Sequence, residues 1–100
     1  MNMNCQLYEK MALEFYKPGH RYHVSEGTLL YTLHYLFQGL NEEVEEVIEA
    51  ESLEDTLDEL GDVLWYVTII ANKMGVSLDK VMMSNINKLE MRDLGGKKNA

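Results

Sequence analysis

The sequence contains one cysteine and one proline, and it has no lysine or arginine between Arg21 and Lys73. Because Cys5 is the only cysteine, no disulfide can form within the chain, as expected of a protein in a reducing compartment. No apolar run approaches the length of a membrane span or a signal peptide. The sequence therefore predicts a cytoplasmic protein, in a cell or in a host cell, with no membrane partner.

Positive charge is scarce over the whole chain. Nine lysines and arginines stand against seventeen acidic residues, which gives a net charge of −8. Binding to duplex nucleic acid needs a basic surface that neutralises phosphates, so the composition argues against a nucleic-acid partner. A phosphorylated small molecule remains compatible with this charge if metal ions bridge its phosphates.

The residues that are abundant favour helices. One proline, seven glycines and 46% hydrophobic residues, with many Leu, Glu, Met and Lys, predict an all-α chain. A chain of 100 residues forms one domain, small enough to gain stability from a partner chain. We expect a single domain over residues 1–94 and a flexible tail over residues 95–100. Helical spacing of apolar residues predicts helices over about residues 4–16, 28–50, 53–74 and 77–92.

The middle two helices are expected to form a tight antiparallel hairpin. Ser52 followed by Asp55 has the pattern of a capping box, so a new helix begins directly after the preceding one. Gly61, inside the second of these helices, costs about 1 kcal/mol relative to alanine. It either permits close approach of another helix or is a tolerated weakness. In that second helix we expect these apolar side chains to be buried: Leu57, Leu60, Val63, Leu64, Val67, Ile70, Ala71 and Met74.

Acidic residues are concentrated in this hairpin. Of the twenty-one residues from Glu42 to Asp62, eleven are acidic. Glu43 and Glu46 share one helical face, as do Glu59 and Asp62, because residues three apart are neighbours on a helix. If the two pairs face each other, four carboxylates converge and require protons or a hard cation. The alternative is a solvated acidic surface, but such surfaces usually carry Lys or Arg four residues from Glu.

The order E-E-x-x-E, twelve intervening residues and E-x-x-D resembles the MazG-like all-α nucleoside triphosphate pyrophosphatases. Gly39-Leu40 before the first motif, Val63 to Tyr66 after the second and three polar residues of the last helix extend the resemblance over about residues 36–92. The resemblance implies a four-to-five-helix bundle completed by homo-oligomerisation, as a dimer or a tetramer. It also implies hydrolysis of a nucleoside triphosphate between the α and β phosphates, giving a nucleoside or deoxynucleoside monophosphate and pyrophosphate.

By match of position, the resemblance implies that Glu43, Glu46, Glu59 and Asp62 hold Mg²⁺ or Mn²⁺. The chemistry agrees, because these ions prefer oxygen ligands and can bridge phosphates while activating water. Glu42 and Glu43 are the candidate catalytic residues. Glu42 projects about 100° around the helix from Glu43, so it either orients water as a general base or faces solvent.

Candidate substrate contacts follow the acidic motifs. Asn85, Lys88 and Arg92 share one face of the last helix and suit triphosphate oxygens. The alternative is that these cations compensate the helix dipole. Tyr66 projects from the same face as the second acid pair, where its ring either stacks on a base or packs in the core. The segment 20–27, with two histidines, is a further candidate for base contact.

Two other functions stay open. Phosphoribosyl-ATP pyrophosphatase has the same fold and similar acidic motifs on a chain of similar length. A non-catalytic acidic helical protein that dimerises or regulates is the second alternative. No Glu is followed by His three residues later, which argues against a ferritin-like di-iron protein, and no P-loop or Ser/Cys nucleophile motif is present.

Overall fold

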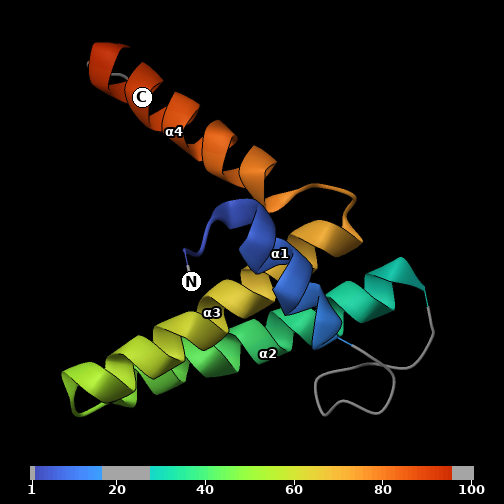
Figure 1. Cartoon of the computed structure of the whole chain (residues 1–100), viewed down its shortest axis with the longest axis vertical. Coiled ribbons are helices and arrows are strands. Elements are labelled where there is room, and N and C mark those ends of the chain that lie inside the picture. Colours follow the sequence, from blue (N-terminus) through green and yellow to red (C-terminus); the bar gives the residue numbers. More distant parts are fainter. Residues whose placement is uncertain (1, 17–27, 96–100) are drawn as a thin grey trace.

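Four helices and no strand make up the part of the chain that the computed structural model describes, residues 2–16 and 28–95 (Figure 1). The prediction of an all-α chain is confirmed, and each expected helix is present. The predicted base-contact segment 20–27 and residues 96–100 of the predicted tail lie outside the described residues. The helices are α1 (Cys5–Glu14), α2 (Leu29–Glu49), α3 (Leu53–Lys73) and α4 (Leu78–Gly95).

The helix boundaries follow local capping chemistry. Ser52 Oγ accepts a hydrogen bond of 3.0 Å from the backbone N–H of Asp55, so α3 begins where the capping pattern predicts. Gly75 adopts a positive φ of 78°, the left-handed conformation that ends many helices, and it terminates α3. Ser77 Oγ then accepts from the backbone N–H of Lys80 at 3.2 Å, which caps the start of α4.

The antiparallel pair of α2 and α3 is the centre of the fold (Figure 1). Leu36 of α2 packs with Tyr66 and Ile69 of α3, and all three side chains are buried. Helix α1 lies against α3, where Trp65 Nε1 donates a hydrogen bond of 3.0 Å to the Ala12 carbonyl oxygen. The apolar core therefore occupies one end of the hairpin, and the acidic residues occupy the other.

The expected burial of α3 is wrong at four of its eight apolar positions. Ile70 is buried, whereas Leu57 is 69% exposed and Leu60 is 49% exposed. Leu64 and Met74 are also exposed. The physical reason is that α1 packs only near the core end of the hairpin, so no described residue covers the remaining apolar face of α3.

Helix α4 projects away from the hairpin (Figure 1). Its first residues are attached to α1, because the backbone N–H of Leu78 donates to Glu9 Oε2 at 3.0 Å and Gln6 Nε2 donates to Asp79 Oδ2 at 3.0 Å. Residues 82–94 are all exposed. Among the described residues, no helix is long and apolar enough to cross a membrane.

Candidate functional site

The facing residues of α2 and α3 form successive layers along the hairpin. Leu36 and Ile69 form an apolar layer within the core. One turn further along α2, Gly39 lies against the ring of Tyr66. The next turns carry Glu43 and Glu46, so the acidic layers begin where the core ends.

Three carboxylates converge in the acidic layers. One oxygen each from Glu43, Glu46 and Glu59 lies within 4.8 Å of the others, and we call these residues the carboxylate cluster. Glu43 is 9% exposed, Glu59 is half-buried and Glu46 is exposed. The structure therefore brings together three of the four predicted metal ligands.

The surroundings of Glu43, the buried member of the cluster, favour its protonated form. Burial raises the pKa of the Glu43 carboxyl from 4.5 to about 7, and the charges of Asp62, Glu46 and Glu59 add to this rise. Glu43 and Glu59 also share a side-chain hydrogen bond, which raises the pKa of Glu43 and lowers that of Glu59. Such a bond requires a proton on one of the two carboxyls, because two ionised carboxylates offer only acceptors.

Glu59 also has a raised pKa, through burial first and then the charges of Glu46 and Asp62. Asp62 is exposed and its carboxylate is not one of the three in the cluster, but it exerts the largest single charge effect on Glu43. Asp62, the fourth predicted ligand, therefore lies close enough to affect the cluster electrostatically.

This arrangement fits a hard divalent cation. Oxygen ligands on opposite sides of Mg²⁺ are about 4 Å apart, given bonds of roughly 2.0–2.1 Å, and three oxygens within 4.8 Å of one another are compatible with that spacing. A bound dication would replace the proton on Glu43 and relieve the repulsion among the carboxylates. The described donors are all carboxylate oxygens, the type that Mg²⁺, Mn²⁺ and Ca²⁺ prefer.

An open pocket of about 300 Å³ adjoins the cluster at the turn between α2 and α3. It gives solvent access to two cluster members, Glu46 and Glu59. A ligand that reached the cluster by this route would meet only acidic and small side chains, so a polyphosphate could enter only with cations. The lining residues are Glu46, Glu49, Ala50, Glu51, Asp55 and Glu59.

One residue close to these acids, Tyr8, is not among the site residues predicted from the sequence. Tyr8 of α1 has its pKa raised by burial and by the charge of Asp62, so its phenol lies within electrostatic reach of Asp62 on α3. No motif marks a tyrosine in a separate helix as a neighbour of an acidic pair. The apolar spacing of α1 indicates that this helix packs on another element, but it does not identify α3 as the neighbour.

The remaining predicted residues lie in different surroundings. Tyr66 is 7% exposed in the core, a placement that supports packing, and base contact stays a prediction. Glu42 is exposed on α2, so its role in orienting water also stays a prediction. Asn85, Lys88 and Arg92 are exposed on α4, which projects away from the hairpin (Figure 1), so the fold of one chain does not bring them to the cluster.

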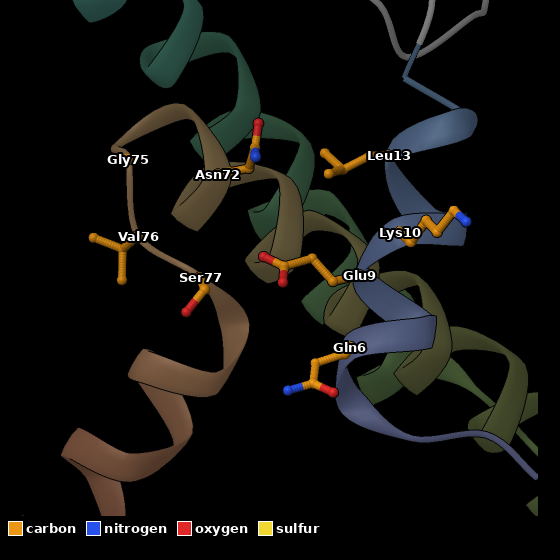
Figure 2. A pocket seen from close by; sticks show the side chains of 8 residues that line it. All are labelled: Gln6, Glu9, Lys10, Leu13, Asn72, Gly75, Val76 and Ser77. Carbon is orange, nitrogen blue, oxygen red and sulfur yellow. The ribbon is translucent and has the colours of Figure 1, made fainter.

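A larger hollow, of about 520 Å³, lies between α1 and the turn from α3 to α4 (Figure 2). Figure 2 shows Glu9 reaching from α1 toward the start of α4. Two of the polar side chains that line it, Gln6 and Glu9, form hydrogen bonds with the first residues of α4. This hollow is therefore part of the contact between α1 and α4. Its lining residues are Gln6, Glu9, Lys10, Leu13, Asn72, Gly75, Val76 and Ser77, and none is a predicted site residue.

Comparison with known proteins agrees with this geometry. The profile of the MazG nucleotide pyrophosphohydrolase domain matches residues 31–94. The chain belongs to this family. The MazG domain includes every predicted site residue from Glu42 to Arg92, whereas α1, with Tyr8 and Glu9, precedes it.

A curated relative of this MazG protein is the Gene 37 protein of Mycobacterium phage L5. The two are 48% identical over 46 residues, which is 46% of this chain and 40% of the phage protein. The matched part of the chain therefore spans less than half the length of that relative. No solved structure is significantly similar to this chain.

Proposed function

We propose that this protein is a metal-dependent nucleoside triphosphate pyrophosphohydrolase that cleaves between the α and β phosphates. The products are a nucleoside or deoxynucleoside monophosphate and pyrophosphate. The observation that carries the proposal is the carboxylate cluster, centred on a nearly buried Glu43, within a MazG domain.

In this proposal Glu43, Glu46 and Glu59 hold Mg²⁺ or Mn²⁺, and Asp62 completes the ligand set. When bound, the ion neutralises phosphate oxygens and activates water for attack. Glu42, exposed beside Glu43 on α2, orients that water and accepts its proton.

The nucleotide requires a second copy of the chain. The cations of α4 are the partners proposed for the triphosphate, yet α4 projects away from the hairpin of its own chain (Figure 1). Exposed apolar side chains on α3 and α4, such as Leu57, Leu60 and Ile86, support packing between chains. We propose a homodimer or homotetramer in which Asn85, Lys88 and Arg92 of one chain serve the cluster of another.

The test is a panel of ribo-, deoxyribo- and modified nucleoside triphosphates, with phosphoribosyl-ATP, incubated with Mg²⁺ or Mn²⁺. The proposal predicts equimolar monophosphate and pyrophosphate, no orthophosphate and no turnover with EDTA. Hydrolysis of phosphoribosyl-ATP alone would favour the histidine-biosynthesis alternative. Metal-independent turnover, orthophosphate release or no turnover of any compound would contradict the proposal.

A matched pair of variants distinguishes the loss of a cluster carboxylate from the loss of any nearby negative charge. Glu46→Gln removes one cluster carboxylate, whereas Glu45→Gln removes the same charge from an exposed neighbouring position on α2. Losing a metal ligand is expected to lower kcat/KM by at least about a hundredfold, while the neighbour changes it by less than about threefold. Equal effects of the two variants would show that the cluster has no special role.

A further inference from the structure

We propose that Gly39 and Tyr66 form a spacer that sets the distance between α2 and α3 at the carboxylate cluster and so makes it selective for a small divalent ion. This inference rests on the proposed function, in which the cluster holds Mg²⁺ or Mn²⁺. Gly39 and Tyr66 act on the ion through the helices that carry its ligands. They are positioning residues.

The contact between the two residues leaves no room for a side chain at position 39. A Cβ atom built on Gly39 would lie 2.5 Å from both Cζ and the hydroxyl oxygen of Tyr66. Non-bonded carbon atoms normally stay about 3.5–4.0 Å apart, so the overlap would be severe. The Tyr66 ring therefore lies directly against the backbone of α2, and only glycine permits this approach.

The Tyr66 ring cannot move aside easily. It is 7% exposed and packs with Leu36 and Ile69 in the core. Trp65 stands edge-on to it, with ring centroids 5.2 Å apart, and Trp65 is itself held by its hydrogen bond to Ala12. A methyl group at position 39 would therefore push the helices apart.

The spacer lies next to the acidic layers on both helices. Gly39 precedes Glu43 by four residues on α2, and Tyr66 follows Asp62 by four residues on α3. Each is one helical turn from an acidic residue of the facing pair. A change of spacing at Gly39 and Tyr66 is therefore transmitted to the oxygens of the cluster.

The relative affinities of the cluster for ions of different size report the spacing between α2 and α3. Mg²⁺ requires octahedral oxygens at about 2.0–2.1 Å, whereas Ca²⁺ accepts six to eight oxygens at roughly 2.3–2.6 Å in flexible geometry. A hairpin that is wider or looser at the cluster should lose affinity for Mg²⁺ more than for Ca²⁺. The ratio of the two affinities therefore reports the spacer, and a general loss of stability would not change it.

The experiment measures metal binding by the 100-residue chain without nucleotide. Mn²⁺ binding is followed by electron paramagnetic resonance, and Mg²⁺ or Ca²⁺ is titrated in as a competitor. Gly39→Ala is expected to reduce the preference for Mg²⁺ over Ca²⁺ by about tenfold, because the added methyl group widens the hairpin. Gly61→Ala is the matched control, since no atom lies within 4 Å of a Cβ there, and it should leave the ratio unchanged.

Two further variants keep the test decisive if Gly39→Ala does not fold. Tyr66→Leu removes the ring and loosens the layer, so it should also lower the preference for Mg²⁺, by at least about threefold. Combining Gly39→Ala with Tyr66→Leu replaces part of the lost volume and should restore the ratio toward that of the wild type.

An unchanged ratio in folded Gly39→Ala or Tyr66→Leu would overturn the spacer while leaving the proposed function intact. A wild-type protein that binds no Mn²⁺ would overturn the proposed function and the spacer together. The two failures are therefore distinguishable.

Discussion

Replacing Glu43 with glutamine should stabilise the metal-free protein near pH 8 while abolishing its response to Mg²⁺. The carboxyl of Glu43 has its pKa raised from 4.5 to about 7. Between these values the folded protein keeps a proton that the unfolded chain releases. Ionisation of Glu43 therefore lowers the free energy of unfolding as pH rises through this range, and the full loss is reached above about pH 8.

The magnitude follows from the size of the shift. Each pKa unit corresponds to about 1.4 kcal/mol, so the shift of Glu43 to about 7 corresponds to roughly 3 kcal/mol. Solvent on the exposed side of the cluster reduces this to roughly 1–2 kcal/mol. For a chain of this size, that is an increase in Tm of roughly 5–10 °C in Glu43→Gln near pH 8, and much less near pH 5.

Glutamine is suited to this test because it keeps the shape of the side chain. Its amide N–H can donate to Glu59, as a protonated carboxyl can. Glu45→Gln, at an exposed position on the same helix, is the control and should change the free energy of unfolding by no more than about 0.5 kcal/mol.

The assay is thermal unfolding followed by circular dichroism at pH 5 and pH 8, with EDTA or with Mg²⁺. A hundredfold excess of Mg²⁺ over its Kd should stabilise the wild type by about 2.7 kcal/mol, and Glu43→Gln should lose this gain. The reasoning is refuted if Glu43→Gln near pH 8 is no more stable than the wild type in EDTA. It is equally refuted if the variant retains the full response to Mg²⁺.

Three further outcomes are expected. Glu9→Ala removes the acceptor for the Leu78 N–H at the start of α4 and should lower the free energy of unfolding, measured by chemical denaturation, by about 1 kcal/mol. Lys10→Ala, at the exposed neighbouring position, should change it very little, and equal losses would contradict a stabilising role of the Glu9 hydrogen bond. Ile86→Asp places a charge on the exposed apolar face of α4 and should convert an oligomer into a monomer in light scattering; a wild type that is already monomeric at micromolar concentration would contradict chain pairing. Lys88→Ala should raise KM for the nucleotide about tenfold, more than Lys80→Ala on the same helix, and equal KM values would remove Lys88 from the substrate site.

The helices were predictable because their signals are local. Apolar spacing identified all four, and Ser52 and Gly75 marked the start and the end of α3. The hairpin brings the two helices together, and the three-residue spacing puts each acid pair on one face, so four carboxylates were expected to converge if the pairs face each other. That is why the convergence of Glu43, Glu46 and Glu59 could be predicted from the sequence.

Other features depend on how helices pack, which their own periodicity does not contain. The sequence treats Glu43 and Glu46 alike, yet only Glu43 is buried, because it lies one layer nearer to the core. A glycine inside a helix is compatible with a close approach between helices, but the sequence does not show that this occurs at Gly39, with Tyr66, and not at Gly61.

The direction of α4 was also outside the reach of the sequence. The first residues of α4 are held by hydrogen bonds with Gln6 and Glu9 of α1, a helix that is far away in the sequence. The exposure of Leu57 and Leu60 follows from the same arrangement, because α4 does not fold back over α3. A local pattern can show that a face is apolar, but it does not say which chain covers it.

The most direct test of the account is a crystal structure of the protein grown with Mn²⁺, with data collected at the manganese absorption edge. The account predicts an anomalous peak at bonding distance from carboxylate oxygens of Glu43, Glu46 and Glu59. A structure in which these side chains keep their mutual contact and no peak lies among them, at millimolar Mn²⁺ and neutral pH, would contradict it.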